Sequence, residues 1–227
     1  MEAGFFFIVI IAVVVGAIVW SILAHQKRRK EAQAWAAARQ WRFTERSSSM
    51  HQGLRAGVFN TGSSRRASLI LEGTFHNVPA ASWNYQYTVS SGSGKSRSST
   101  TYHFHVLELG LPEALPSLEL SPDNAFRRFF GRGIEFEDDE FNRAWRVASD
   151  DERIAYDVIH PRMMERLMRP DLRGLSFLIQ GNRLLIWRRG RQNLAAIDGG
   201  LATLVEFYRH IPDYLWQQIR ERRSFGR

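Results

Sequence analysis

The chain has 227 residues, no cysteine and a formal net charge of +8, from 31 Lys and Arg against 23 Asp and Glu. The lack of cysteine excludes a disulfide scaffold, a thiolate zinc site, a cysteine nucleophile and an iron–sulfur cluster. A hydrophobic content of 44% is sufficient for a buried core and excludes a wholly disordered protein.

The first element is an apolar segment at the amino terminus. No charged side chain occurs from Ala3 to Ala24. At about 1.5 Å per residue, a helix of this length crosses the ~30 Å hydrocarbon core of a bilayer. A cleaved signal peptide has a basic start, a shorter apolar run and a small-residue cleavage site, whereas this segment starts with Glu2. We therefore predict that residues 1–24 are a retained transmembrane anchor, with Trp20 in the headgroup layer.

The residues that flank this anchor predict its orientation. A basic run follows it directly and consists of Lys27, Arg28, Arg29 and Lys30. Because basic side chains stay on the cytoplasmic side, we expect a single-pass protein of the cell membrane, with its N-terminus outside and its C-terminal domain in the cytoplasm. The remaining positive charge is modest and accompanies no recognition motif, so we expect the lipid bilayer, and no nucleic acid, as a partner.

Residues 25–50 combine the basic run with a segment that favours a helix. The alanine-rich stretch 31–42 has a high helix propensity. A helix lying along the lipid surface and the first core helix of the domain both fit this pattern. Three serines at 47–49 predict a loop after it.

Residues 51–220 predict a single α+β domain. Alternation of apolar and polar residues marks strands in its first half. The strands that we expect occupy residues 67–75, 83–88, 100–109, 118–120 and 145–147. Turn residues lie at 76–79, and a Ser/Gly-rich loop lies at 90–99.

Helices dominate the second half of this region. A capping box at Ser149–Glu152 predicts a helix start, and Pro161 suits the first turn of the next helix. Gly181-Asn182 predicts a two-residue hairpin between strands at 175–179 and 183–187. The remaining helices that we expect lie at 125–130, at 201–208 and, after Pro212, at 214–220, followed by a basic tail at 221–227. The fold class is therefore α+β: one N-terminal transmembrane helix and a domain with an antiparallel sheet and several helices.

Three motifs that suggest chemistry have simpler interpretations. Gly94-Lys95-Ser96 resembles the end of a phosphate-binding loop, but Val89 stands where the motif requires glycine, which favours a flexible loop. His103 and His105 share one strand face and need a third metal ligand, for which His76 is the nearby candidate; half-buried strand histidines are favoured. The acidic run at 135–140 lacks the glycine of a calcium loop, which favours a solvated turn. We therefore predict no catalytic residue, no metal ligand and no cofactor.

One set of polar residues remains as a speculative cluster. It consists of Arg143, Asp150, Asp151 and His160. If the fold brings these side chains into one pocket with convergent polar groups, an enzymatic site becomes the better interpretation.

Three stretches carry a resemblance to a known family. They are residues 34–43, residues 135–147 and residues 151–164, the last ending in His160-Pro161-Arg162-Met163-Met164. Together they resemble a family of uncharacterised bacterial membrane-anchored proteins that is common in actinobacteria. The resemblance covers residues 34–216 and implies a membrane-anchored bacterial domain, with no activity, cofactor or catalytic residue to carry over.

The leading functional hypothesis is a non-enzymatic accessory or binding domain that one transmembrane helix holds at the bilayer. Such an anchor raises the effective concentration of the domain for membrane-bound partners, among which we expect another membrane protein. The alternatives are an enzyme with a site assembled from Asp, Glu, His and Arg, and a domain that binds anionic lipid headgroups through its basic patches.

Overall fold

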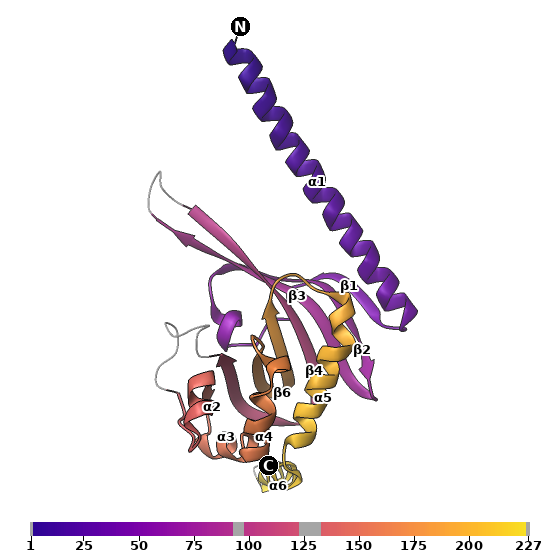
Figure 1. Ribbon diagram of the computed structural model, residues 1–227. Coiled ribbons are helices and arrows are strands. Elements are labelled where there is room, and N and C mark those ends of the chain that lie inside the picture. Colours follow the sequence, from indigo (N-terminus) through magenta and orange to yellow (C-terminus); the bar gives the residue numbers. More distant parts are fainter. Residues whose placement is uncertain (1, 93–97, 123–132, 226–227) are drawn as a thin grey trace.

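A single long helix leads into the domain. The computed structural model describes residues 2–92, 98–122 and 133–225 (Figure 1). Helix α1 (Glu2–Ala38) contains 37 residues and projects away from the domain at its N-terminal end. Its stretch from Ile10 is long and apolar enough to cross a membrane, and the apolar window is not buried inside the protein. The apolar N-terminal helix that the sequence predicts is therefore present.

The alanine-rich segment is the end of α1 and forms no separate helix. Ala32 and Ala36 are each 1% exposed, so the segment packs in the domain core and does not lie along a lipid surface. The expected helix over 31–42 is wrong at its end, because α1 stops at Ala38 and Gln40 adopts a positive φ of 56°. The chain then turns into a strand that the sequence did not predict, β1 (Arg42–Ser47).

Six strands form one antiparallel sheet. The path is β1-β2-β3-β4-β5, and β6 also pairs with β4. Besides β1, the strands are β2 (Ser63–Phe75), β3 (Val78–Ser91), β4 (Ser98–Pro122), β5 (Trp145–Ser149) and β6 (Ser176–Arg189). Together with the helices, this sheet confirms the α+β class. The expected strands at 100–109 and 118–120 are two parts of β4, which is 25 residues long.

The hairpin predicted at Gly181-Asn182 is wrong. Both flanking segments belong to β6 and pair with β4: Leu184 lies opposite Leu109, and Ile179 lies opposite Leu118. Gly181 adopts a φ of +62° where the pairing register shifts between the two strands. Gly181 therefore has the left-handed conformation of a hairpin turn, but it lies at a register shift within the long strand β6.

Helices cover one face of the sheet (Figure 1). They are α2 (Asp139–Ala144), α3 (Glu152–Val158), α4 (Pro161–Leu167), α5 (Ile197–His210) and α6 (Asp213–Phe225), with short 3₁₀ turns η1 (Gly57–Asn60), η3 (Pro170–Leu172) and η4 (Leu194–Ala196). The helix start at Pro161 and the interruption at Pro212 agree with the sequence, and the helix expected at 201–208 lies within α5, which begins four residues earlier at Ile197. The helix expected at 125–130 and the Gly94-Lys95-Ser96 motif lie outside the described residues.

The capping box predicted at Ser149–Glu152 names the wrong residue as the N-cap of α3. Asp151 is the N-cap of α3, and its Oδ1 accepts a hydrogen bond from the backbone N–H of Ile154 at 3.2 Å. Ser149 ends β5, and its hydroxyl donates to the carbonyl oxygen of Ser117 at 2.8 Å. Since the strand continues to Ser149, the helix begins later than the motif predicts.

The two faces of the sheet pack against different elements. In β3, Trp83 and Tyr85 are fully buried in a cluster with Phe59 of η1. On the opposite face, Leu107 and Leu109 of β4 belong to the larger core that includes α3 to α6 and the end of α1. Because neighbouring side chains on a strand point to opposite faces, residues 82, 84 and 86 lie on the face that α1 covers.

Candidate functional site

The foot of α1 packs closely against the sheet. Ala32 and Ala36 are small enough to bring the helix backbone near the strands, and both are buried. Trp35 meets Trp41 edge to face with 5.2 Å between ring centroids, and the guanidinium of Arg39 lies 4.2 Å above the Trp35 ring. This packing fixes the direction of the apolar helix relative to the domain.

Two ion pairs extend the same contact. The Arg39 Nη2 atom lies 3.0 Å from the Asp198 Oδ2 atom at the start of α5. The Arg29 Nε atom lies 3.1 Å from the Glu45 Oε2 atom of β1. Because all four side chains are solvent-exposed to about one-third or more, each pair contributes at most about 1 kcal/mol, and packing holds the helix.

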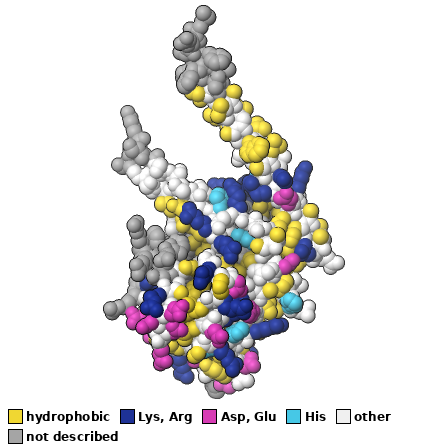
Figure 2. All heavy atoms as spheres, viewed as in Figure 1, with side chains coloured by type: hydrophobic (Ala, Val, Ile, Leu, Met, Phe, Trp, Pro, Cys, Tyr) yellow, Lys and Arg dark blue, Asp and Glu magenta, His cyan; other side chains and the backbone are white. Residues whose placement is uncertain are grey.

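A cleft of about 250 Å³ opens between this foot, the sheet and the segment before α5. We call it the basic cleft, because four arginines and one acid line it: Arg28, Arg46, Arg66, Arg191 and Glu31. Figure 2 shows Lys and Arg side chains gathered where α1 meets the domain. Among the described residues, no carboxylate lies within ion-pair distance of these four arginines, and Glu31 itself pairs with Lys27 at 3.9 Å. The cleft therefore carries an excess of positive charge.

A row of polar residues crosses five strands, and its members on β1, β2 and β3 line the cleft. The register places Arg46 of β1 opposite Ser68 of β2, Ser68 opposite Asn84 of β3, and Asn84 opposite His105 of β4. His105 in turn lies opposite Arg188 of β6. Asn84 is only 6% exposed, and its Nδ2 donates to the Ser68 Oγ at 3.4 Å. The sheet face that the helices cover is therefore polar along this row. The same face is apolar at Leu107 and Leu109, further along β4.

His105 joins this row to the segment before α5. Its Nδ1 accepts the backbone N–H of Asn193 at 3.4 Å, and its Nε2 lies 3.0 Å from the Ser82 Oγ, which also accepts from the Gln192 Nε2 at 2.8 Å. Burial lowers the pKa of His105 to about 4, with a smaller contribution from Arg188. The imidazole is therefore neutral at physiological pH and acts as a fixed hydrogen-bonding group.

The three histidines considered as metal ligands do not gather. His103 and His105 lie on β4, whereas His76 lies in the tight turn between β2 and β3. In the described ranges, no group of three His, Asp or Glu side chains is arranged to hold a metal ion. Burial, and next the charges of Arg191 and Arg28, hold the pKa of His103 below its usual value. The positive charge of the basic cleft therefore contributes, after burial, to the low pKa of His103.

The speculative polar cluster is distributed over several contacts. Asp151 caps α3, and His160 precedes α4 and contacts the carbonyl oxygen of His210 through its Nε2 at 2.8 Å. The backbone N–H of Asp150 donates to the carbonyl oxygen of Ser117, and Arg143 lies in α2 at the wall of a surface pocket. No hydrogen bond or ion pair joins any two of the four residues in the part of the chain that the structure describes.

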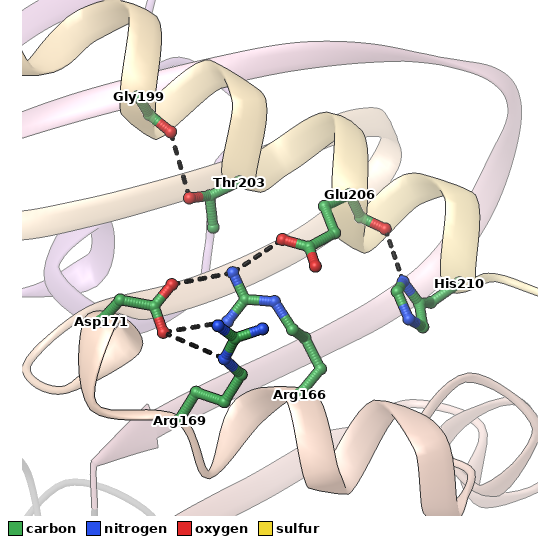
Figure 3. A network of polar contacts seen from close by, with 7 residues as sticks. All are labelled: Arg166, Arg169, Asp171, Gly199, Thr203, Glu206 and His210. Atoms are coloured by element: carbon green, nitrogen blue, oxygen red, sulfur yellow. Dashed lines mark hydrogen bonds and ion pairs between the residues drawn. The ribbon is translucent and has the colours of Figure 1, made fainter.

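The most connected charged network lies between α4 and α5 (Figure 3). The Nη2 atom of Arg166 contacts Glu206 at 2.7 Å and Asp171 at 2.9 Å, while the Arg166 side chain is 11% exposed. The hydrogen bonds from Arg166 lower the pKa of both carboxyl groups. This network joins α4, the turn η3 and α5 to one another.

The residues predicted to flank the membrane lie along α1. Trp20 is 77% exposed, like its apolar neighbours on this part of the helix. Lys27 and Lys30 are exposed, Arg29 pairs with β1, and Arg28 lines the basic cleft. Sequence reasoning found this basic run but missed Arg46, Arg66 and Arg191, because strand register brings them together from distant positions.

The fold defines a class of protein: an α+β domain with a long antiparallel sheet, joined to one N-terminal apolar helix. Within that class, the chain is similar to a solved structure, the mycobacterial trehalose monomycolate transport factor A, TtfA. The TM-score is 0.56 at 16% sequence identity, over 81% of this chain and 96% of that chain. At this identity the likeness shows the fold. No family model matches the chain. No curated protein matches it either.

Proposed function

We propose that the protein is a single-pass, membrane-anchored accessory subunit of a lipid-transport system. The observation that carries this proposal is the continuity of α1, which runs from its exposed apolar stretch into the docked segment without a break. A domain held in this way stays at the membrane in a fixed orientation, where a membrane-bound partner meets it at high effective concentration. The shared fold with a protein described as a trehalose monomycolate transport factor supports the choice of system.

Lipid distribution in the cell tests the accessory role. Deleting the coding sequence is expected to reduce the amount of one surface lipid class and to leave its precursor inside the cell, and the full chain is expected to restore transport. A chain that lacks residues 1–24 is expected to fail, since it is no longer held at the membrane. Unchanged lipid classes on both sides of the membrane after deletion would contradict the proposal.

The domain lies on the cytoplasmic side in this proposal, because Lys27 to Lys30 follow the apolar stretch. The absence of cysteine allows a direct test with single-cysteine variants. Ser48→Cys lies in an exposed turn after β1 and is expected to react with a membrane-impermeant maleimide only after the cells are permeabilised. Ala3→Cys, on the other side of the anchor, is expected to react in intact cells. Labelling of Ser48→Cys in intact cells would reverse the orientation.

A further inference from the structure

We propose that the basic cleft binds the phosphate group of an anionic lipid in the leaflet where the apolar stretch of α1 ends. The inference rests on the proposed anchoring and names the ligand class of the cleft. Three properties of the cleft support this assignment: its depth, its charge and its size.

The depth of the cleft follows from its position on α1. Arg28 lies four residues after Ala24, the last residue of the uncharged stretch, which corresponds to about 6 Å along a helix. The headgroup layer on each side of a bilayer is roughly 5–7 Å thick. Since α1 is continuous here, the cleft that Arg28 lines is level with the lipid phosphates.

The charge of the cleft matches a phosphate diester. Guanidinium groups bind phosphate oxygens through paired, charge-assisted hydrogen bonds. Four arginines approach the cleft from four separate elements: Arg28 from α1, Arg46 from β1, Arg66 from β2, and Arg191 from the segment before α5. Glu45 of β1 already pairs with Arg29 and lies near His25. Glu31 partly offsets the charge of Arg28, and an anionic ligand would supply countercharge to the other arginines of the cleft.

The size and floor of the cleft select a headgroup. A volume of about 250 Å³ lies below the usual range for whole drug-sized ligands, so acyl chains remain in the bilayer while the polar group enters. The carboxamides of Asn84, Gln86 and Gln192 line the floor and suit the hydroxyl and ester oxygens of a glycerophosphate. The low pKa of His103, to which Arg28 and Arg191 contribute, agrees with a positive potential at this position.

The test uses the full chain in lipid nanodiscs. Discs of phosphatidylcholine alone are compared with equimolar discs of phosphatidylcholine and phosphatidylglycerol, and native mass spectrometry counts the lipids that stay bound. Incorporation into phosphatidylcholine discs checks the anchoring separately. The wild type is expected to retain phosphatidylglycerol preferentially and to unfold at a higher temperature in its presence.

Two variants decide whether the cleft is responsible. The double variant Arg66→Gln, Arg191→Gln is expected to lower the phosphatidylglycerol preference by at least about tenfold, because two charge-assisted contacts are lost. Both side chains are exposed, so the unfolding temperature in phosphatidylcholine alone is expected to match the wild type. The control double variant Arg153→Gln, Arg162→Gln removes the same two charges from exposed positions on α3 and α4 and is expected to keep the preference for phosphatidylglycerol.

The outcomes separate the sources of the anion. An equal loss in the Arg153→Gln, Arg162→Gln control would overturn the proposal, since it would indicate general attraction between charges. No loss in the Arg66→Gln, Arg191→Gln variant would also overturn it, since the cleft arginines would then not be needed for binding. Added inorganic phosphate in phosphatidylcholine discs tests a soluble ligand. If phosphate alone raised the unfolding temperature and phosphatidylglycerol added nothing, the lipid assignment would be overturned.

Discussion

A buried carboxyl group in the middle of the sheet gives the sharpest stability prediction. Glu119 of β4 is 6% exposed and pairs in register with Leu178 of β6 and Ala148 of β5. The chain approaches it closely at Gly57, where an added Cβ would lie 2.7 Å from the Glu119 Oε1 atom. Burial raises the pKa of Glu119 from 4.5 to about 7, against smaller opposing contributions from the Gly57 backbone and Arg146.

The sign of the effect follows from proton binding. Below pH 4.5 the carboxyl group is protonated in both the folded and the unfolded chain, and it causes no penalty. Between pH 4.5 and about 7 the unfolded chain binds fewer protons than the folded chain, so the free energy of unfolding falls as pH rises. At about 1.4 kcal/mol per pH unit over that interval, the loss reaches about 3 kcal/mol and stays constant at higher pH.

Replacing Glu119 with glutamine removes this penalty. Glu119→Gln is expected to stabilise the protein by about 3 kcal/mol at pH 8 and to have little effect at pH 4. Urea unfolding of the full chain in a mild detergent, followed by tryptophan fluorescence at both pH values, measures the difference. Glu165→Gln, on the exposed side of α4, serves as the control and is expected to change neither value. Equal effects of Glu119→Gln at pH 4 and pH 8 would refute the reasoning.

Two pairs of substitutions test the packing and the backbone by the same unfolding measurement. Ala36→Leu overfills the contact between α1 and the sheet and is expected to cost about 1–3 kcal/mol, whereas Ala37→Leu, one residue further on the exposed side, is expected to cost nothing. Equal effects would mean that α1 is not docked. Gly199→Ala, in α5 with open space around the new Cβ, is expected to stabilise by about 0.5–1 kcal/mol. Gly181→Ala also meets open space but has a φ of +62°, and is expected to destabilise by about 1 kcal/mol; a gain in stability would contradict its left-handed conformation.

Local patterns predicted the elements whose own residues determine their structure. The uncharged run after Glu2, the alternation around Trp83 and the helical spacing from Leu201 each depend on neighbours within a few residues. For this reason the predicted apolar N-terminal helix, the strand around Trp83 and the helix that contains Leu201 agree with α1, β3 and α5 of the structure.

The errors arose where a distant strand decides the structure. Gly181-Asn182 has the composition of a hairpin turn, but both flanks pair with β4, so the local signal does not determine the connection. The strand β1 is short and polar, and its pairing with β2 decides its conformation.

Local sequence patterns did not predict the candidate site, because distant segments form it. The sequence indicated Arg28 through its position after the apolar run, but Arg46, Arg66 and Arg191 carry no shared spacing. They meet because β1, β2 and the segment before α5 lie side by side under α1. The sequence does contain one signal for the site, a polar residue on each strand at equivalent register. This signal can be recognised only when the order of the strands is known.

Alkaline carbonate extraction of cell membranes tests the central claim most directly, because it removes peripheral proteins and leaves integral ones. If α1 crosses the bilayer, the full chain stays in the membrane pellet and retains residues 1–24 by mass spectrometry. A chain that appears in the supernatant, or that is shortened at its N-terminus, would contradict both the anchoring and the placement of the basic cleft at the lipid phosphates.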